Sequence, residues 1–323
     1  MHYFKSLSFA SPQPGPRLIV LGAVHGNEIA GTQGILRVID ELERGVFKLV
    51  SGSVTFVPIT NPLAYELARR AGDRNLNRNL NPTEAPQDFE DQIANWLCPL
   101  LAQHDVLLDL HSFQSPGRAF AMVGPLNNDE ALEPFHHAHQ EEALALRLGV
   151  GRVVDGWLST YARGVARRNQ SLAADASRAQ QLTADARYGV GTTEYMRSVG
   201  GYSLTLECGQ HADPQAPEVA YQAIHNTLAH LGLSDRPDPS PAQDVEALHL
   251  YEVIDKVHVE DAFVRTWASF DRLKQGEVIG TRHNGEVLVA DCDGYIVFPN
   301  AKAEAGHEWF YLARETDRFA NAA

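Results

Sequence analysis

The stretch Leu18-Ile-Val-Leu-Gly-Ala-Val-His-Gly-Asn-Glu28 joins an apolar run to a polar end. The run from Leu18 to Val24 follows a cluster of prolines and glycine and predicts a buried strand. It gives way to His25-Gly-Asn-Glu28 and then to a helix-like segment over 29–42. In open α/β folds, ligands bind at the carboxyl ends of the strands. The stretch therefore predicts an α/β fold with a functional site where this strand ends.

His25 and Glu28 are three residues apart, so a single turn can direct an imidazole and a carboxylate at one point. Both are ligand types found in catalytic zinc sites, which keep a position open for water. Taken alone, however, a His-x-x-Glu motif is more often a surface pair than a metal site. A third ligand in the right context is needed to decide between the two interpretations.

The rest of the chain alternates between predicted strands and helices. Apolar runs and helical periodicity predict these elements: strands over 52–59, 104–111 and 202–206, and helices over 63–70, 88–101, 130–148 and 217–231. Residues 117–123 are a further strand candidate, and we expect 191–196 to be an ordered loop or a strand end. The role of the long polar region over 157–195 stays open at this stage.

A proline-rich segment over 232–243 predicts a linker, because Pro237, Pro239 and Pro241 lie there among serine and aspartate. Beyond it, short alternating runs are separated by turn signals such as Asn284-Gly285, which is typical of small β structures. We therefore expect a catalytic domain over residues 1–235 and a β-rich C-terminal domain over 244–323.

Composition narrows the classes of protein to consider. The 323 residues carry a formal net charge of −14, which argues against nucleic acid or an anionic membrane as partner. No apolar run approaches the roughly 20 residues that span a bilayer, and the N-terminal residues lack the pattern of a signal peptide. Three widely spaced cysteines fit a reducing cytoplasm. The oligomeric state cannot be inferred from these features.

His111 supplies the third candidate ligand, because it ends the predicted strand over 104–111. If the two strands are parallel neighbours, His25, Glu28 and His111 meet at one sheet edge. Two histidines and a glutamate with an open position are typical of a hydrolytic zinc site rather than a structural one. Asp109 shares the strand face of His111, so either Asp109 or a backbone carbonyl fixes the tautomer of a ligand.

Glu207 ends a third apolar run, Ser-Leu-Thr-Leu over 203–206. A carboxylate beside an activated water can act as general base and then as proton donor. The alternative is a strand-end carboxylate that is merely solvated, and the apolar residues before it make that alternative less favourable.

The arginines of this acidic chain gather in loops beside predicted strand ends: Arg70, Arg74, Arg78 and Arg197. Asn77-Arg78 offers an amide and a planar guanidinium that together can bind a carboxylate through two hydrogen bonds. Taken singly, each arginine is better explained as a solubilising surface residue.

Five motifs occur in the order and spacing of a known family: His25-Gly-Asn-Glu28, Asn61-Pro62 with Arg70, Asn75-Leu-Asn77-Arg78, Asp109-Leu-His111 and Leu206-Glu207. Together they resemble the succinylglutamate desuccinylase/aspartoacylase family, a branch of the zinc carboxypeptidase-like hydrolases. The resemblance covers residues 18–210 and the C-terminal β-rich part. It implies a mixed parallel and antiparallel sheet flanked by helices, with the C-terminal domain narrowing the mouth of the site.

The resemblance also implies a role for each matching residue. By this resemblance, His25, Glu28 and His111 would bind one Zn²⁺ per chain. Glu207 would activate the attacking water, and Arg70 would stabilise the oxyanion. Asn77, Arg78 and Arg197 would bind the carboxylates of the substrate.

One segment departs from the family pattern. Aspartoacylases carry a substrate-binding tyrosine in a C-terminal segment similar to Phe298-Pro-Asn-Ala-Lys-Ala-Glu-Ala-Gly-His307, and His307 stands at that place here. Either an imidazole replaces the phenol, or the alignment is shifted by a residue or more. The departure leaves the acyl group and the amino acid open.

The sequence thus predicts a zinc-dependent amidohydrolase that cleaves an amide, or a related ester, of a small N-acyl amino acid carrying a carboxylate. Two alternatives stay open. A metallocarboxypeptidase would use the same carboxylate-binding pair on a peptide C-terminus. A zinc-binding scaffold whose catalysis has lapsed would bind the metal and hydrolyse nothing.

Overall fold

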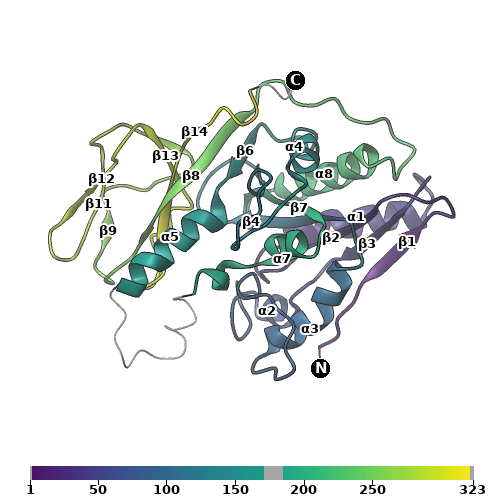
Figure 1. The fold of residues 1–323 in the computed structure, drawn as a ribbon, viewed down its shortest axis with the longest axis horizontal. Helices are drawn as coiled ribbons and strands as arrows, with labels where there is room; N and C mark the ends of the chain where they lie inside the picture. The colour runs from purple at the N-terminus through teal and green to yellow at the C-terminus, as the bar shows by residue number, and fades with distance from the viewer. Residues whose placement is uncertain (1, 171–184, 321–323) are drawn as a thin grey trace.

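A single large sheet runs through the molecule (Figure 1). The computed structural model describes residues 2–170 and 185–320, in which eleven strands follow the order β1-β3-β2-β4-β7-β5-β6-β8-β14-β13-β10. Their bounds are β1 (Leu7–Ala10), β2 (Arg17–Leu21), β3 (Ser53–Val57), β4 (Val106–Phe113), β5 (Phe120–Met122), β6 (Arg152–Asp155), β7 (Tyr202–Gln210), β8 (Glu246–Asp255), β10 (Asp271–Leu273), β13 (Gly294–Val297) and β14 (Glu308–Glu315). A smaller sheet contains β9 (Ala262–Phe263), β11 (Val278–Thr281) and β12 (Val287–Val289).

Helices cover both faces of the large sheet. They are α1 (Ala30–Glu43), α2 (Pro62–Glu66), α3 (Phe89–Leu101), α4 (Ala138–Ala145), α5 (Trp157–Gln170), α7 (Thr192–Ser198) and α8 (Ala216–His230), with a 3₁₀ turn η1 (Ala186–Gly189). β2 is parallel to β3 and β4, and β4 is parallel to β7. By contrast, β1 is antiparallel to β3, and β5 is antiparallel to β7. The predicted mixed sheet flanked by helices is confirmed.

The two faces of β2 show why the opening stretch forms a buried strand. Leu18 and Val20 pack into a cluster with α1 and α8, whereas Ile19 and Leu21 pack into a second cluster with α3. Successive side chains of a strand point to opposite faces, so a strand covered on both sides needs an unbroken apolar run. Residues 18–21 supply that run, and none of them is exposed.

Several element boundaries differ from the sequence prediction. The segment over 191–196 begins helix α7, which is capped by a hydrogen bond from the Gly191 N–H to the Glu194 carboxylate at 2.9 Å. The helix predicted over 130–148 is confined to 138–145, because Pro134 disfavours helical backbone at the residue before it. Helix α5 was not predicted, although Trp157, Tyr161 and Val165 recur at helical spacing.

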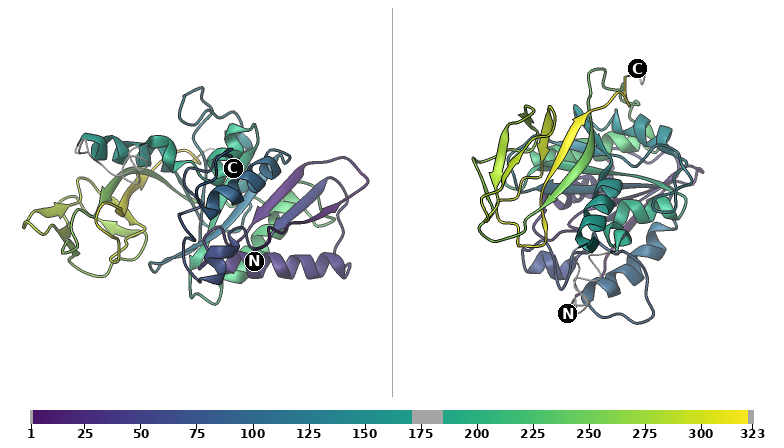
Figure 2. Two further views of the ribbon diagram at one scale, coloured as in Figure 1. Left: turned by 90° about the horizontal axis from the view of Figure 1, so that it is seen from below. Right: turned by 60° about the vertical axis from the view of Figure 1, so that its left-hand side comes forward.

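The C-terminal part is rich in β structure, as predicted, but its strands continue the large sheet. β8 lies parallel to β6 and antiparallel to β14, which joins the two parts through backbone hydrogen bonds. Figure 2 shows the C-terminal strands at one end of the molecule and α1 and β1 at the other. Segment 232–243 holds no helix or strand, only an isolated bridge at Ser234. Its function as a boundary between independent domains stays a prediction.

Within residues 2–170 and 185–320, none of the helices has the length and apolar character needed to cross a bilayer.

Candidate metal centre and active-site pocket

The turn after β2 carries His25 and Glu28. The Glu28 N–H donates to the His25 carbonyl at 3.1 Å and closes the turn. Gly26 lies so close to α2 that an added Cβ would come within 1.9 Å of the Ala64 carbonyl carbon, so only glycine fits there. The turn is thereby pressed against α2 and held at the carboxyl end of β2.

β4 brings His111 to the same point. Leu21 of β2 pairs with Asp109 of β4, so His111 lies just beyond the end of β2. His111 Nδ1 is 2.8 Å from Glu28 Oε2 and 3.2 Å from His25 Nδ1, and His25 Nδ1 is 2.9 Å from Glu28 Oε1. The ligand atoms of the three side chains all lie within 4.8 Å of one another, and all three are buried. The structure therefore brings together the predicted metal ligands.

The protonation of the three residues suits a cation. Burial and the charge of Arg70 lower the pKa of His25 to about 4, so its Nδ1 keeps a lone pair. Burial alone would lower the pKa of His111, but Asp109 and Glu28 on either side raise it well above its ordinary value. Burial opposes the charge of Glu28, yet the two imidazoles hold its pKa well below the usual range. The proton on His111 Nδ1 thus lies between His25 Nδ1 and Glu28 Oε2. A metal ion could replace this proton and be bound by all three side chains.

Each imidazole is oriented from behind. His25 Nε2 donates to Asn75 Oδ1 at 3.0 Å, and His111 Nε2 donates to Asp109 Oδ2 at 2.9 Å. The Thr192 hydroxyl also donates to Asp109 Oδ2. Such contacts fix the tautomer of metal-binding histidines and leave the other ring nitrogen free for the metal. Asp109, rather than a backbone carbonyl, plays this part for His111, and sequence reasoning assigned no role to Asn75.

Glu207 lies beside this group on β7. It pairs in register with His111 across the parallel β4–β7 ladder, which places both side chains on one face of the sheet. Burial is the main reason that the pKa of Glu207 is raised to about 8, with Glu28 and Asp109 contributing. Among the described residues, none makes a hydrogen bond to the buried Glu207 Oε2. Glu207 is therefore a buried carboxyl group with an unused oxygen, not a solvated strand end.

Arg70 reaches the same group from the segment after α2. Its Nη1 donates to Glu28 Oε1 at 3.0 Å and to His25 Nδ1 at 3.2 Å, and half of its side chain is exposed. The loop that follows is held by the buried Glu90, whose carboxylate accepts the backbone N–H groups of Gly72, Asp73 and Arg74. Sequence reasoning missed Glu90, because nothing in a helical pattern signals a carboxylate that binds a distant loop.

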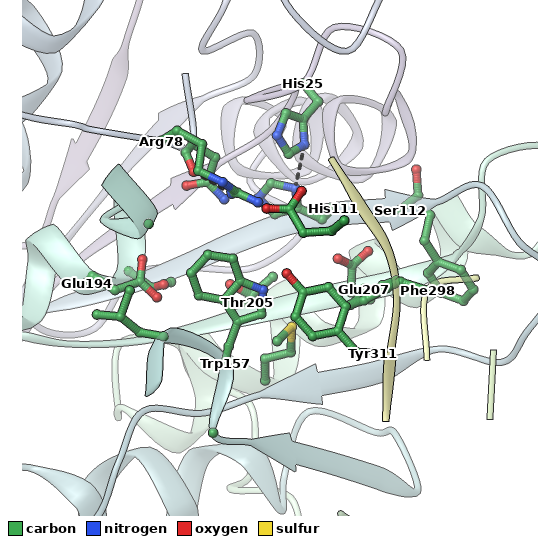
Figure 3. Close-up of a pocket in the computed structure, with 18 of the residues that line it drawn as sticks. His25, Arg78, His111, Ser112, Trp157, Glu194, Thr205, Glu207, Phe298 and Tyr311 are labelled. Carbon is green, nitrogen blue, oxygen red and sulfur yellow. Dashed lines mark hydrogen bonds between the residues drawn. The ribbon is translucent and has the colours of Figure 1, made fainter. Parts of the chain in front are cut away.

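A pocket of about 350 Å³ opens beside the candidate metal centre (Figure 3). Asn77 and Arg78 line it, and their binding of a substrate carboxylate stays a prediction. Asn77 Oδ1 accepts the Thr192 N–H at 2.9 Å, which anchors Asn77 to the start of α7. The Arg78 guanidinium lies 4.8 Å over the Trp157 ring, and its Nη1 donates to the Asn77 carbonyl at 2.8 Å.

Arg197 lines the pocket, but its guanidinium is hydrogen-bonded to other residues of the protein. Its Nε donates to Glu141 Oε1 at 2.7 Å, its Nη1 to Glu133 Oε1 at 2.8 Å, and its Nη2 to the Ser203 carbonyl at 3.1 Å. The buried guanidinium thus has no free pair of donors with which to grip a substrate. The structure corrects the predicted contact with a substrate carboxylate: Arg197 balances buried acidic groups.

His307 also needs a correction, because it does not line the pocket. It is exposed in the turn before β14, where its carbonyl accepts the Lys256 N–H at 2.9 Å. Glu308 and Tyr311 of β14 line the pocket instead, with Trp157 of α5. The register shift between Glu308 and Phe310 interrupts the alternation of β14. A bulge of this kind resets which side chains share a face, so period-two reasoning could not find this pair.

Solved structures share the fold over nearly the whole chain. A succinylglutamate desuccinylase from Vibrio cholerae matches with a TM-score of 0.70 and 18% identity, covering 96% of this chain and 85% of that one. A succinylglutamate desuccinylase/aspartoacylase from Rhodobacter sphaeroides matches with a TM-score of 0.68 and 18% identity, covering 94% and 87%. The ectoine utilization protein EutE from Ruegeria pomeroyi matches with a TM-score of 0.69 and 16% identity, covering 96% and 88%.

The sequence itself matches a family model over residues 14–154, described as the succinylglutamate desuccinylase/aspartoacylase catalytic domain. This part of the chain is therefore similar to the catalytic domain of a family of hydrolases. The matched residues of the desuccinylase/aspartoacylase domain include His25, Glu28, Arg70 and His111, whereas Glu207 lies beyond them. No curated protein matches the chain.

Proposed function

We propose that this protein belongs to the desuccinylase/aspartoacylase family and is a zinc-dependent amidohydrolase that cleaves a small N-acyl amino acid or a related carboxylate-bearing amide or ester. The observation that carries the proposal is the position of Glu207. Its unused, buried oxygen lies beside the His25–Glu28–His111 group and inside the pocket that Arg78 lines.

The donor set fits one Zn²⁺ per chain. Two imidazole nitrogens and one carboxylate lie within a few ångströms of one another, and Asn75 and Asp109 orient the imidazoles from behind. This composition is that of catalytic zinc sites with an open position. When bound by His25, Glu28 and His111, zinc would supply Lewis acidity toward a carbonyl and toward the attacking water.

Glu207 and Arg70 divide the remaining chemistry. Glu207 takes a proton from the attacking water and passes it to the leaving nitrogen, a role for which its unused oxygen beside the candidate ligands is placed. Arg70 directs Nη1 at the centre of the site. There it stabilises the oxygen that becomes negative, a contribution of about 3–4 kcal/mol for a comparable donor.

Arg78 holds the substrate by its carboxylate. Its Nη1 donates to the Asn77 carbonyl, and no ion pair joins the guanidinium to another described residue, so it retains donors for a ligand. Asn77 keeps its amide beside Arg78 through the bond to Thr192. A volume of about 350 Å³ is at the small end of ligand pockets, which favours an acyl amino acid over a folded protein chain.

The proposed partner is therefore a small carboxylate substrate, with neither nucleic acid nor a membrane involved. We place the reaction in the cytoplasm, which is supported by three free cysteines: Cys98, Cys208 and Cys292.

The test is hydrolysis by zinc-loaded enzyme of a panel of N-acyl amino acids, matching esters and short peptides, with Glu207→Gln as the blank. Hydrolysis of acyl amino acids that needs a free carboxylate supports the proposal. Cleavage of peptide C-termini alone would make the protein a carboxypeptidase. Bound zinc without any hydrolysis would identify a lapsed scaffold and overturn the proposed activity.

A further inference from the structure

A carboxylate of the C-terminal part faces the substrate pocket. Glu308, the first residue of β14, is partly buried and lines the same pocket as Arg78. Burial by itself raises the pKa of Glu308, but the charges of Arg78 and Arg168 lower it below its ordinary value. Glu308 is therefore ionised at neutral pH.

Glu308 and Arg78 carry opposite charges and line the same pocket, but they do not form an ion pair. Within the described residues, no nitrogen of a basic side chain lies within 4.0 Å of the Glu308 carboxylate, and no side chain makes a hydrogen bond to it. Burial opposes the charge of Arg78, yet Glu308 raises the pKa of that guanidinium. Two opposite charges thus influence each other at the wall of one pocket without a direct ion pair.

Aromatic side chains line the same region. The rings of Trp157 and Tyr161 stack with centroids 5.3 Å apart and planes inclined by 7°. Arg78 lies over both rings, at 4.8 Å and 5.5 Å, so their faces already attract one cation. In Figure 3 the Tyr311 hydroxyl points into the space below Arg78, with the Trp157 ring alongside.

The other charges of the pocket do not favour a substrate with two carboxylates. Arg70 pairs with Glu28, and Arg197 is surrounded by Glu133 and Glu141. Of the pocket arginines in the described part of the chain, Arg78 alone has no carboxylate within ion-pairing distance. The acidic residues that line the pocket are Glu133, Glu194, Glu207 and Glu308. A second substrate carboxylate near Arg78 would therefore meet Glu308 rather than a cation.

We propose that Arg78 and Glu308 together bind a zwitterionic group, and that the substrate is an N-acylated diamino acid. Arg78 binds its carboxylate, and Glu308, which lines the same pocket as Trp157 and Tyr311, binds its ammonium. This inference rests on the proposed hydrolase function and identifies the substrate class. Two isomers share this chemistry: the acyl group on the α-nitrogen with a free side-chain ammonium, or the acyl group on the side chain with a free α-ammonium.

The experiment compares acetate release by the zinc-loaded enzyme from four compounds: Nα-acetylornithine, Nδ-acetylornithine, Nα-acetylnorleucine and Nα-acetylglutamate. Norleucine has the length of ornithine without the charge. We expect one ornithine isomer to exceed both the norleucine and the glutamate compounds in kcat/KM by about tenfold or more, the range for a hydrogen bond to a charged group. The better isomer identifies which nitrogen carries the acyl group.

Glu308→Gln should reduce that preference for ornithine over norleucine to within a few-fold. Glu304→Gln, an exposed carboxylate in the preceding turn, is the matched control and should retain it. Binding of the same four compounds to zinc-loaded Glu207→Gln, measured by titration calorimetry, gives a readout that does not depend on turnover.

The outcomes separate the two proposals. Acetate release without a preference for either ornithine isomer overturns the zwitterion site and leaves the hydrolase intact. Preferential binding of an ornithine isomer without turnover supports the zwitterion site and overturns the hydrolase. A preference for acetylglutamate, an unchanged preference in Glu308→Gln, or neither binding nor turnover overturns the inference.

Discussion

Asp109 Oδ2 accepts a hydrogen bond from His111 Nε2 at 2.9 Å, two residues further along the same strand. Residues two apart on a strand share a face, so β4 supplies both a candidate ligand and the group that orients it. The Thr192 hydroxyl of α7 holds the same oxygen of Asp109. The orientation of His111 therefore depends on the sheet and on a helix more than eighty residues away.

Asp109→Asn should weaken zinc binding by about 10- to 100-fold, because an amide can no longer fix the charge and tautomer of His111. Competition with a chelator measures the affinity. Asp105→Asn, at the entry to the same strand and paired with the exposed Arg17, serves as control and should bind zinc as the parent does. Equal affinity in both variants would contradict a role for Asp109.

Glu207→Gln should lower kcat by about 10²- to 10⁴-fold, the usual contribution of a general acid–base group. Zinc content should stay at one per chain, because Glu207 is not among the three clustered ligand side chains. Metal analysis and steady-state kinetics on the same preparation check both statements. A variant that keeps its zinc and most of its activity would remove Glu207 from the mechanism.

Arg197→Met should destabilise the protein by about 3–5 kcal/mol, the cost of leaving buried carboxylates without their partner. Glu141 Oε1 would lose its 2.7 Å bond to Arg197 Nε, while keeping the Ser203 N–H. Urea denaturation measures the free energy of unfolding. A variant of parental stability whose KM has risen would instead restore the predicted role in substrate binding.

Glu133 should make stability depend on pH. Burial raises its pKa from 4.5 to about 7, with Glu194 and Glu141 adding to the rise against the opposing charge of Arg197. Between these two pH values the folded protein binds more protons at this group than the unfolded chain does. Its contribution to the free energy of unfolding therefore falls as pH rises through that window.

Glu133→Gln should flatten this decline, since an amide does not titrate. Denaturation of the parent and the variant at several pH values between 4.5 and 7 provides the comparison. Identical pH dependence would show that Glu133 keeps an ordinary pKa in the folded protein.

Tyr311→Phe should lower kcat/KM by up to about tenfold, the value of one neutral hydrogen bond, because the hydroxyl faces the pocket. His307→Ala should have no effect, since His307 is exposed outside the pocket. Kinetics on the best substrate of the panel distinguish the two variants. If His307→Ala lowered kcat/KM and Tyr311→Phe did not, His307 would stand at the position of the family's substrate-binding tyrosine.

The fold class and the clustering of the candidate metal ligands could be predicted from local sequence. His25 and Glu28 share one turn, and His111 and Glu207 each end an apolar run, so parallel pairing of β2, β4 and β7 brings them together. Those patterns are periodic and short-range, and a strand buried on both faces has few alternatives.

The roles of the arginines and of the C-terminal residues were decided by tertiary structure alone. Arg78 and Arg197 look alike in sequence, but distant carboxylates occupy Arg197 and leave Arg78 available. Likewise, a bulge in β14 turns Glu308 and Tyr311 toward the pocket and leaves His307 outside it. Sequence by itself determined which residues end the strands, because backbone periodicity is local; burial and charge pairing depend on partners that only the folded chain brings within reach.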